Sequence, residues 1–565
     1  MLRPEKLGIS AEPKAAVDTL NNWVRDCGKT LPADNSPVSD SAADKLISQP
    51  ARTAAGGELY DRQDIEHVRN CWLFKQARSG IVRQHDSDVA RTVALFELAC
   101  RIVALTGKGD LTAPLNLYDI AVIGKGEPED RAWIFAELLR QTGIDAVILR
   151  PAPAKTGATP PRWLVGALVD KQIYLFDPTL GWPIPSPSDK GTTAAVESAA
   201  TLAQVLADDK LLRKLDISAE KPYPLHSADL KSARAEIITS SRYSSPRIRR
   251  LESFLSGDRS VTIYVPVGDV GSRPGLLSRV ANAGAGVWKK EDVAIWDYPD
   301  RQTAAIDHLD GNLAKYHSFL WLPFQGPVTA DLDKEKMKLN ISPGSRKQIK
   351  SRIAQLQGDY AGAVRNYLLV QLDELPPAIP LPPEMQAAVR AQQQKPQEGP
   401  IGLPVPQLAF AMNFRAAEDA KFWMAVCQLE QNMLEPATET LDAYWRRYIE
   451  GGKWIPQTAL LRGLTLARTG KYALAVQQIN EISHALPEDD PRWATCQLFT
   501  TRWRAARDAA NSSGATSQAA VAAEQPRPEP KPKQEASPPA KASGSGTKAE
   551  TSPPAAPPSA TTKKP

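Results

Sequence analysis

Cysteine is scarce in this chain, and it contains no long hydrophobic run. The 565 residues include five cysteines without regular spacing, at Cys27, Cys71, Cys100, Cys427 and Cys496. A disulfide framework or a zinc site needs paired or repeated cysteines, so we expect neither, and we expect no metal and no cofactor. No stretch approaches the roughly 20 apolar residues of a membrane-spanning helix, so we expect no membrane span.

The chain also lacks a strong excess of charge. Its net charge is +5, and the residues from Ala509 onward contribute +3 through seven basic and four acidic residues. The rest is nearly neutral, whereas a nucleic-acid-binding domain carries a basic face, so we expect no nucleic-acid partner. The start, Met1–Lys14, has no apolar signal-peptide core, which favours a cytoplasmic location. An extracytoplasmic location follows if the true start lies upstream.

Two segments carry the clearest structural pattern. The first is GEPEDRAWIFAELLRQTGIDAV, Gly126–Val147, and the second is RWLVGALVDKQIYLFDPT, Arg162–Thr179. Apolar residues recur at helical spacing over Glu129–Gln141, with Pro128 suited to the first helical position and Gly143 to the C-terminal cap. Short buried strands are expected at Ile144–Leu149, Leu164–Leu168 and Ile173–Phe176.

These segments resemble the core of the transglutaminase-like superfamily, a relative of papain-type cysteine enzymes. In that family the first segment reads roughly G-x-C-x-[DE]-x-A, and the second begins H-x-W and ends in a strand closing with D-P. In this chain Pro128 stands at the position of the nucleophilic cysteine and Pro161 at that of the histidine base. Only the third triad position, Asp177, keeps its residue. The resemblance therefore implies an α+β papain/transglutaminase-like core without the family's catalytic pair.

No other residue takes over the missing chemistry. No cysteine lies between Arg101 and Val426, and Cys71 and Cys100 sit in apolar helical stretches that predict buried, inert thiols. A working triad needs a nucleophile and a base within hydrogen-bond reach, and His85 and His226 lie outside the motif. The resemblance places the candidate cleft at Glu129, Asp130, Arg131, Trp133, Trp163 and Asp177.

Asp177 opens the turn D-P-T-L-G-W-P. A carboxylate at that place accepts hydrogen bonds from the backbone that follows it. We therefore expect Asp177 to be retained for structure, although a role in orienting a ligand in a remodelled cleft remains the alternative.

The chain divides into five predicted regions. Residues 1–57 read as an extension with a short helix at Ala15–Val24, and 58–225 as the transglutaminase-like domain. Residues 226–330 read as a small α+β region with strands at Ala235–Thr239, Val261–Val265 and Val293–Tyr298. Between them, Pro246–Leu255 reads as a helix whose Arg247, Arg249 and Arg250 form a solvated face.

Residues 335–508 read as helical and weakly repetitive, and they resemble tetratricopeptide repeats. Gly358, Tyr360, Ala363 and Tyr367 match the second half of such a repeat; a fuller match runs from Gly470 to Pro487, and Gly463 takes the small-residue position of the first helix. A Pro-rich loop, 375–406, interrupts the array. The segment 509–565 reads as a disordered tail rich in Pro, Ala and Lys. A candidate partner surface lies at Trp445, Arg446 and Arg447, because Trp and Arg favour interfaces.

Two functions follow from this sequence. The first is a non-catalytic binding or scaffold protein that uses its cleft and helical repeats to hold a protein or peptide. The second is a hydrolase or transferase of the same superfamily that acts through non-thiol residues such as Asp119, Glu129, Asp130 or Asp177. Replacement of both catalytic residues by proline favours the first. The oligomeric state is left open.

Overall fold

The computed structural model describes residues 11–27, 53, 55–152, 162–284, 286–324, 328–333, 338–343, 347–372 and 405–523. Residues 1–511 form one compact unit. Pro161, nearly all of the predicted loop 375–406 and the predicted tail from residue 524 lie outside the described residues. The short helix predicted within 1–57 is present as α1 (Ala11–Cys27).

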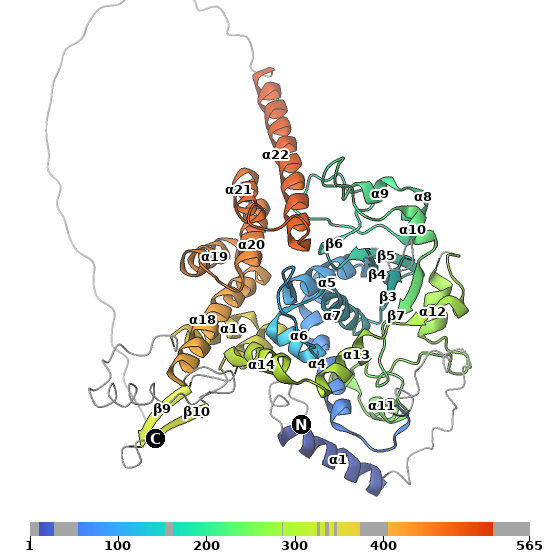
Figure 1. Cartoon of the computed structure of the whole chain (residues 1–565). Helices are drawn as coiled ribbons and strands as arrows, with labels where there is room; N and C mark the ends of the chain where they lie inside the picture. The colour runs from blue at the N-terminus through green and yellow to red at the C-terminus, as the bar shows by residue number, and fades with distance from the viewer. Residues whose placement is uncertain are drawn as a thin grey trace, which may run out of the picture. The chain divides into compact units, whose positions relative to one another are not determined.

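The centre of the compact unit is a six-stranded sheet with the order β6–β5–β4–β3–β7–β8 (Figure 1). Neighbouring strands are antiparallel except β7 and β8, which are parallel. The strands are β3 (Asp145–Arg150), β4 (Leu164–Val169), β5 (Gln172–Asp177), β6 (Trp182–Pro183), β7 (Arg234–Ile237) and β8 (Ala294–Ile295). Strands β7 and β8 belong to the predicted region 226–330, so that region and the predicted domain 58–225 share one sheet.

Side chains alternate between the two faces of the sheet along each strand, and each face packs into its own core. On β3, Ile148 packs into a core that it shares with α5 (Asp88–Ile102) and α7 (Pro128–Arg140). Its neighbour Val147 packs into a second core on the opposite face. The second core includes Leu202 and Leu277 from the helices that lie between β6 and β8 in the chain. These helices are α8 (Leu202–Ala207), α9 (Lys210–Arg213), α10 (Ser227–Lys231), α11 (Pro246–Glu252) and α12 (Leu276–Ala283).

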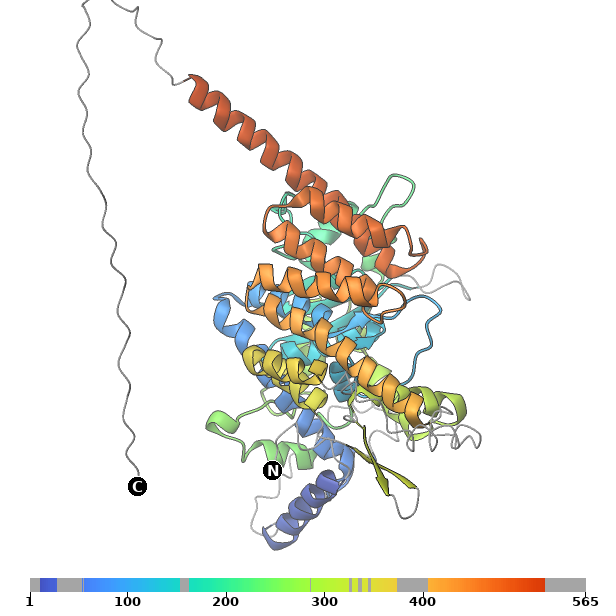
Figure 2. The ribbon, with the colours of Figure 1, turned by 90° about the vertical axis from the view of Figure 1, so that its left-hand side faces the viewer.

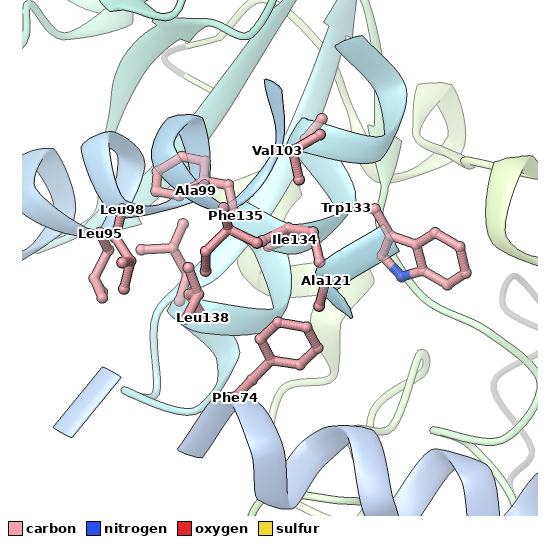
Figure 3. Close-up of a cluster of buried hydrophobic side chains, with 14 of the residues drawn as sticks. Phe74, Leu95, Leu98, Ala99, Val103, Ala121, Trp133, Ile134, Phe135 and Leu138 are labelled. Atoms are coloured by element: carbon pink, nitrogen blue, oxygen red, sulfur yellow. The ribbon is translucent and has the colours of Figure 1, made fainter. Parts of the chain in front are cut away.

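Helix α7 (Pro128–Arg140) is buried over its whole length from Asp130 onward. Figure 3 shows Phe135 and Leu138 on the side of α7 that meets Leu95 and Leu98, with Trp133 on the far side of the helix. The helices around it are α4 (Arg62–Gln84), α5 (Asp88–Ile102) and α6 (Leu117–Ile123), and the short parallel strands β1 (Ala104–Leu105) and β2 (Lys125–Gly126) lie beside it. The first predicted segment is therefore a central core helix, as its apolar spacing indicated.

Region 226–330 differs from its prediction at two of three strands. Val261–Val265 forms no strand, because side chains satisfy part of its backbone: one carboxylate oxygen of Glu252 accepts from Ile263 N and Tyr264 N at 2.8 and 2.6 Å. The segment Val293–Tyr298 gives only the two residues of β8 before α13 (Tyr298–Asp307) and α14 (Gly311–Leu320) begin.

Arg247 was predicted on a solvated helix face, and that prediction is wrong. Its guanidinium is buried and pairs with both carboxylate oxygens of Asp64, at 2.7 and 3.0 Å. Because Asp64 lies on α4 and Arg247 on α11, this pair links the two helices.

The C-terminal part is a succession of helical hairpins, drawn from yellow to orange-red in Figure 2. Contacting pairs are α15·α16, α18·α19 and α20·α21, and the hairpin of β9 (Val328–Asp333) and β10 (Lys338–Pro343) precedes them. The helices are α15 (Lys347–Leu356), α16 (Tyr360–Leu372), α18 (Val405–Glu430), α19 (Leu434–Tyr448), α20 (Ile455–Arg468), α21 (Tyr472–Ser483) and α22 (Pro491–Ala523). Helix α22 thus continues beyond the predicted end of the helical region at Asp508.

A small residue allows close packing between α20 and α22. A Cβ added to Gly463 would lie 2.7 Å from the Trp503 ring. The six-stranded sheet and the helices α4–α14 form what we call the sheet domain. Buried Arg352 of α15 links it to the hairpins, because its guanidinium donates to Ala121 O and Ile102 O, near the C-terminal ends of α6 and α5. The same guanidinium stacks over the Trp423 ring of α18, 3.5 Å from its centroid. The fold as a whole is mixed α+β.

Candidate functional site

The position that the resemblance gives to a nucleophile lies at the start of α7. Pro128 is the first helical residue, and Glu127 N donates to Asp130 Oδ2 at 2.9 Å, which closes the first turn. Proline suits this position because the first turn of a helix needs no N–H from it. The predicted helix start is confirmed, and it presents a pyrrolidine ring instead of a reactive group. The position given to the base, Pro161, lies outside the described residues.

Asp177 is fully buried at the end of β5. Its Oδ1 accepts from Thr179 N at 2.8 Å and from Leu180 N at 2.9 Å, which confirms the predicted turn. Its Oδ2 accepts from the Tyr223 hydroxyl at 2.7 Å, and Arg162 Nε lies 3.7 Å away. Both carboxylate oxygens are therefore engaged in holding the turn and the adjoining loop.

The resemblance placed Trp163 and Asp177 in one cleft with the first residues of α7, and this is wrong for Asp177. Phe176 packs against Phe135 of α7, with ring centroids 5.1 Å apart. The next residue of a strand points to the opposite face, where Asp177 meets Tyr223. Trp163 stays on the α7 side, buried in the same core as Phe135, with the Arg150 guanidinium 5.4 Å from its ring.

The other candidate cleft residues point to different sides of α7. Successive residues of a helix lie about 100° apart around its axis, so Asp130, Arg131 and Trp133 line three separate cavities, of about 180, 140 and 90 Å³. We call them the Asp130 cavity, the Arg131 cavity and the Trp133 cavity. Glu129 is only partly buried beside them, and its carboxyl has a pKa raised above its usual range, chiefly by burial. The six predicted residues thus form no single cleft.

The Arg131 cavity lies where the sheet domain meets the helical hairpins. One wall comes from α5, β1 and the segment after β5, and the other from α18, α20 and α22. Most of its lining is apolar, including Ala104, Leu180, Trp182, Phe422, Leu461, Leu464 and Phe499. Sequence reasoning found Arg131 but not these partners, because residues as far apart as Glu97 and Phe499 come together here only through the tertiary fold.

Arg131 is buried but has no carboxylate partner among the described residues. Its Nε and Nη2 donate to Val103 O at 3.3 and 2.9 Å, and its Nη1 donates to Pro178 O at 2.8 Å. The other arginines of the cavity are ion-paired: Arg101 with Glu430, and Arg492 with Asp490. Cys100 also lines the cavity, and burial raises the pKa of its thiol, so the thiol stays neutral beside Arg131.

A cysteine–histidine pair that we had not predicted lies on α4. Cys71 Sγ is 3.9 Å from His67 Nε2, one helical turn away. Burial raises the pKa of the thiol and lowers that of the imidazole. His67 Nε2 lies 2.8 Å from Ile263 O, so this nitrogen carries a hydrogen and donates a hydrogen bond to the carbonyl. That nitrogen cannot take a proton from Cys71. The prediction of a buried, inert thiol is confirmed for Cys71, but it is wrong in part for Cys100, which is only partly buried and lines the Arg131 cavity.

The Asp130 cavity contains the most perturbed carboxyl of the candidate set. Burial raises the pKa of Asp130 to about 7, against the lowering effect of hydrogen bonds from Glu127 N and from the Tyr298 hydroxyl, 2.8 Å from Oδ1. Glu127 and Tyr298 line the same cavity. This site offers a carboxyl that titrates near neutral pH, although both of its oxygens serve structural hydrogen bonds.

The predicted partner surface on α19 is partly exposed. Arg446 and Arg447 are exposed, whereas Trp445 is half-buried and lies 5.2 Å from the Arg462 guanidinium. Asp119, offered as an alternative acid, is buried on α6 with His317 Nε2 3.6 Å from its carboxylate. Neither place adds a reactive group to the cavities around α7.

Comparison of the chain with protein family models, curated proteins and solved structures yields no match. Within the described residues, no group of three or more His, Cys, Asp or Glu side chains is arranged to hold a metal ion. The same part of the chain contains no helix long and apolar enough to cross a bilayer.

Proposed function

We propose that this protein is a catalytically inactive relative of the transglutaminase-like superfamily that binds a protein or peptide partner in the Arg131 cavity. The observation that carries the proposal is the cavity itself, a mostly apolar hollow between the sheet domain and the helical hairpins. Helical repeats commonly use such surfaces to hold proteins.

The size of the cavity sets what it can take. A volume of about 140 Å³ is close to that of an engineered cavity of about 150 Å³ that binds benzene. It therefore suits one apolar side chain of a partner, an anchor of the kind that dominates protein interfaces. A complete small-molecule cofactor would need several hundred Å³.

The absence of working thiol chemistry supports binding over catalysis. Pro128 offers no nucleophile, Asp177 is held by its turn and by Tyr223, and Cys71 is a protonated core thiol. A nucleophilic enzyme needs an accessible thiolate or hydroxyl with a base beside it. The described residues at these positions do not provide that arrangement.

A photo-crosslinking experiment in the full chain tests the proposal. Leu464 lines the Arg131 cavity and is half-buried, whereas Leu474 on α21 is 50% exposed and does not line it. With a benzoylphenylalanine at each position in turn, we expect a discrete adduct in cells from position 464 and none from position 474. No adduct from 464, or the same adduct from both positions, would contradict a partner site in this cavity.

A second candidate function is acid–base hydrolysis at the Asp130 cavity, favoured by the pKa of Asp130 near 7. A general acid or base works best with a pKa close to the working pH. If this candidate holds, the full chain hydrolyses simple ester or amide substrates, and Asp130→Asn and Glu127→Gln each abolish the turnover. Turnover that survives both substitutions would eliminate it.

A further inference from the structure

Three buried polar groups of the Arg131 cavity have unused hydrogen-bonding capacity. A guanidinium has five N–H donors, and Arg131 uses three of them on Val103 O and Pro178 O, so one N–H remains on each terminal nitrogen. The indole Nε1–H of Trp182, a residue only 4% exposed, has no acceptor among the described residues. Gln457 Oε1 is buried and has no donor within the same part of the chain. All three residues line the cavity.

These groups define the chemistry of a ligand. Arg131 and Trp182 offer only donors, so they require acceptor oxygens, and Gln457 Oε1 requires an N–H. The charge of Arg131 favours an anion, because the carboxylates near it are paired elsewhere: Glu97, which also lines the cavity, pairs with Arg101, and Asp177 pairs with Arg162. Two oxygens of one carboxylate match the two remaining guanidinium N–H groups.

The last residue of a peptide combines these three features: an apolar side chain that can be of benzene size, a carboxylate and a nearby N–H. We propose that the Arg131 cavity binds the free C-terminal residue of a partner: its apolar side chain fills the cavity, its carboxylate meets Arg131 and Trp182, and its amide N–H meets Gln457. This inference rests on the proposed binding function and names its ligand. A fatty acid supplies the carboxylate but no N–H, and its chain exceeds the cavity.

Ligand-observed NMR titrations of the full wild-type chain test this assignment without any variant. The probes are N-acetylphenylalanine, its C-terminal amide and decanoate. We expect a Kd on the order of 1 mM for the acid, given its size. Charge-assisted hydrogen bonds should make the acid bind at least about tenfold more tightly than the amide. Decanoate should bind more weakly than N-acetylphenylalanine.

Three substitutions separate the roles of the cavity residues. Arg131→Gln should bring the acid to the affinity of the amide, and Trp182→Phe should weaken the acid more than the amide. Leu464→Ala, the control, removes part of the apolar wall and should weaken both probes by the same factor.

Each failure has a distinct meaning. Equal binding of acid and amide by the wild type would overturn the carboxylate assignment while leaving an apolar partner site in place. Tighter binding of decanoate would overturn the peptide assignment. Absence of binding by all three probes would overturn this inference, whereas the crosslinking at position 464 tests the proposed function separately.

Discussion

Replacing Asp177 tests whether this acid is a structural remnant. The side chain is fully buried and accepts three hydrogen bonds, from Thr179 N, Leu180 N and the Tyr223 hydroxyl. Asp177→Ala removes all three and leaves buried donors without acceptors. At about 1 kcal/mol net for each bond, plus the penalty for the stranded donors, we expect the free energy of unfolding to fall by roughly 3–5 kcal/mol.

Two companion variants divide this loss between the turn and the Tyr223 contact. Asp177→Asn keeps an oxygen for the turn, so it should cost about 1–2 kcal/mol, mainly at the contacts with Tyr223 and Arg162. Tyr223→Phe removes a single hydrogen bond and should cost about 1 kcal/mol. The exposed Asp258 provides a matched control, and Asp258→Ala should change stability by less than about 0.5 kcal/mol.

Urea unfolding followed by tryptophan fluorescence measures these differences as shifts of the midpoint. A loss below about 0.5 kcal/mol for Asp177→Ala would refute the structural role. Equal losses for Asp177→Ala and Asp177→Asn would refute the assignment of the turn bonds to Oδ1.

Three further predictions concern the core around α7 and its junction with the helical hairpins. The pKa of Asp130 is about 7 in the folded state and has its ordinary value of 3.8 when the chain is unfolded, so wild-type stability should fall as pH rises from 4 to 7. This loss of unfolding free energy between pH 4 and 7 is on the order of 4 kcal/mol, and Asp130→Asn should not show it. The same dependence of stability on pH in wild type and Asp130→Asn would contradict the burial of this carboxyl. Arg352→Met leaves Ala121 O and Ile102 O without their buried donor. We expect the free energy of unfolding, measured by urea unfolding, to fall by about 2–4 kcal/mol. Gly124 has φ +74°, and an added Cβ would lie 2.3 Å from the Trp423 ring, so Gly124→Ala should lower the melting temperature. The control is Gly143→Ala: Gly143 has φ +78° and open space around it, so this variant should cost only the backbone strain of about 1 kcal/mol.

The sequence was informative wherever a local pattern determines the structure. The apolar period of Glu129–Gln141, with proline before it and Gly143 after it, led to α7, and the turn after Asp177 followed from the hydrogen-bonding habit of aspartate. Both are short-range properties of the chain.

The site itself depended on longer-range facts. The face of the sheet on which Asp177 lies follows from strand register, which the motif did not specify. The strand predicted at Val261–Val265 failed because side chains outside the segment bind its backbone, namely Glu252 from the preceding helix and Gln141 from 121 positions away. Trp182 and Gln457, which complete the Arg131 cavity, are 275 positions apart and carry no shared sequence signal.

Intact-mass spectrometry of the full chain tests the central claim, that this protein binds partners without thiol catalysis. The chain is incubated with a glutamine-containing peptide and a primary amine, and the masses of the protein and the peptide are measured over time. The account predicts a peptide of unchanged mass and a protein without any acyl adduct. An adduct that is abolished by iodoacetamide, together with amine-modified or cleaved peptide that is lost in Cys71→Ala or Cys100→Ala, would contradict it.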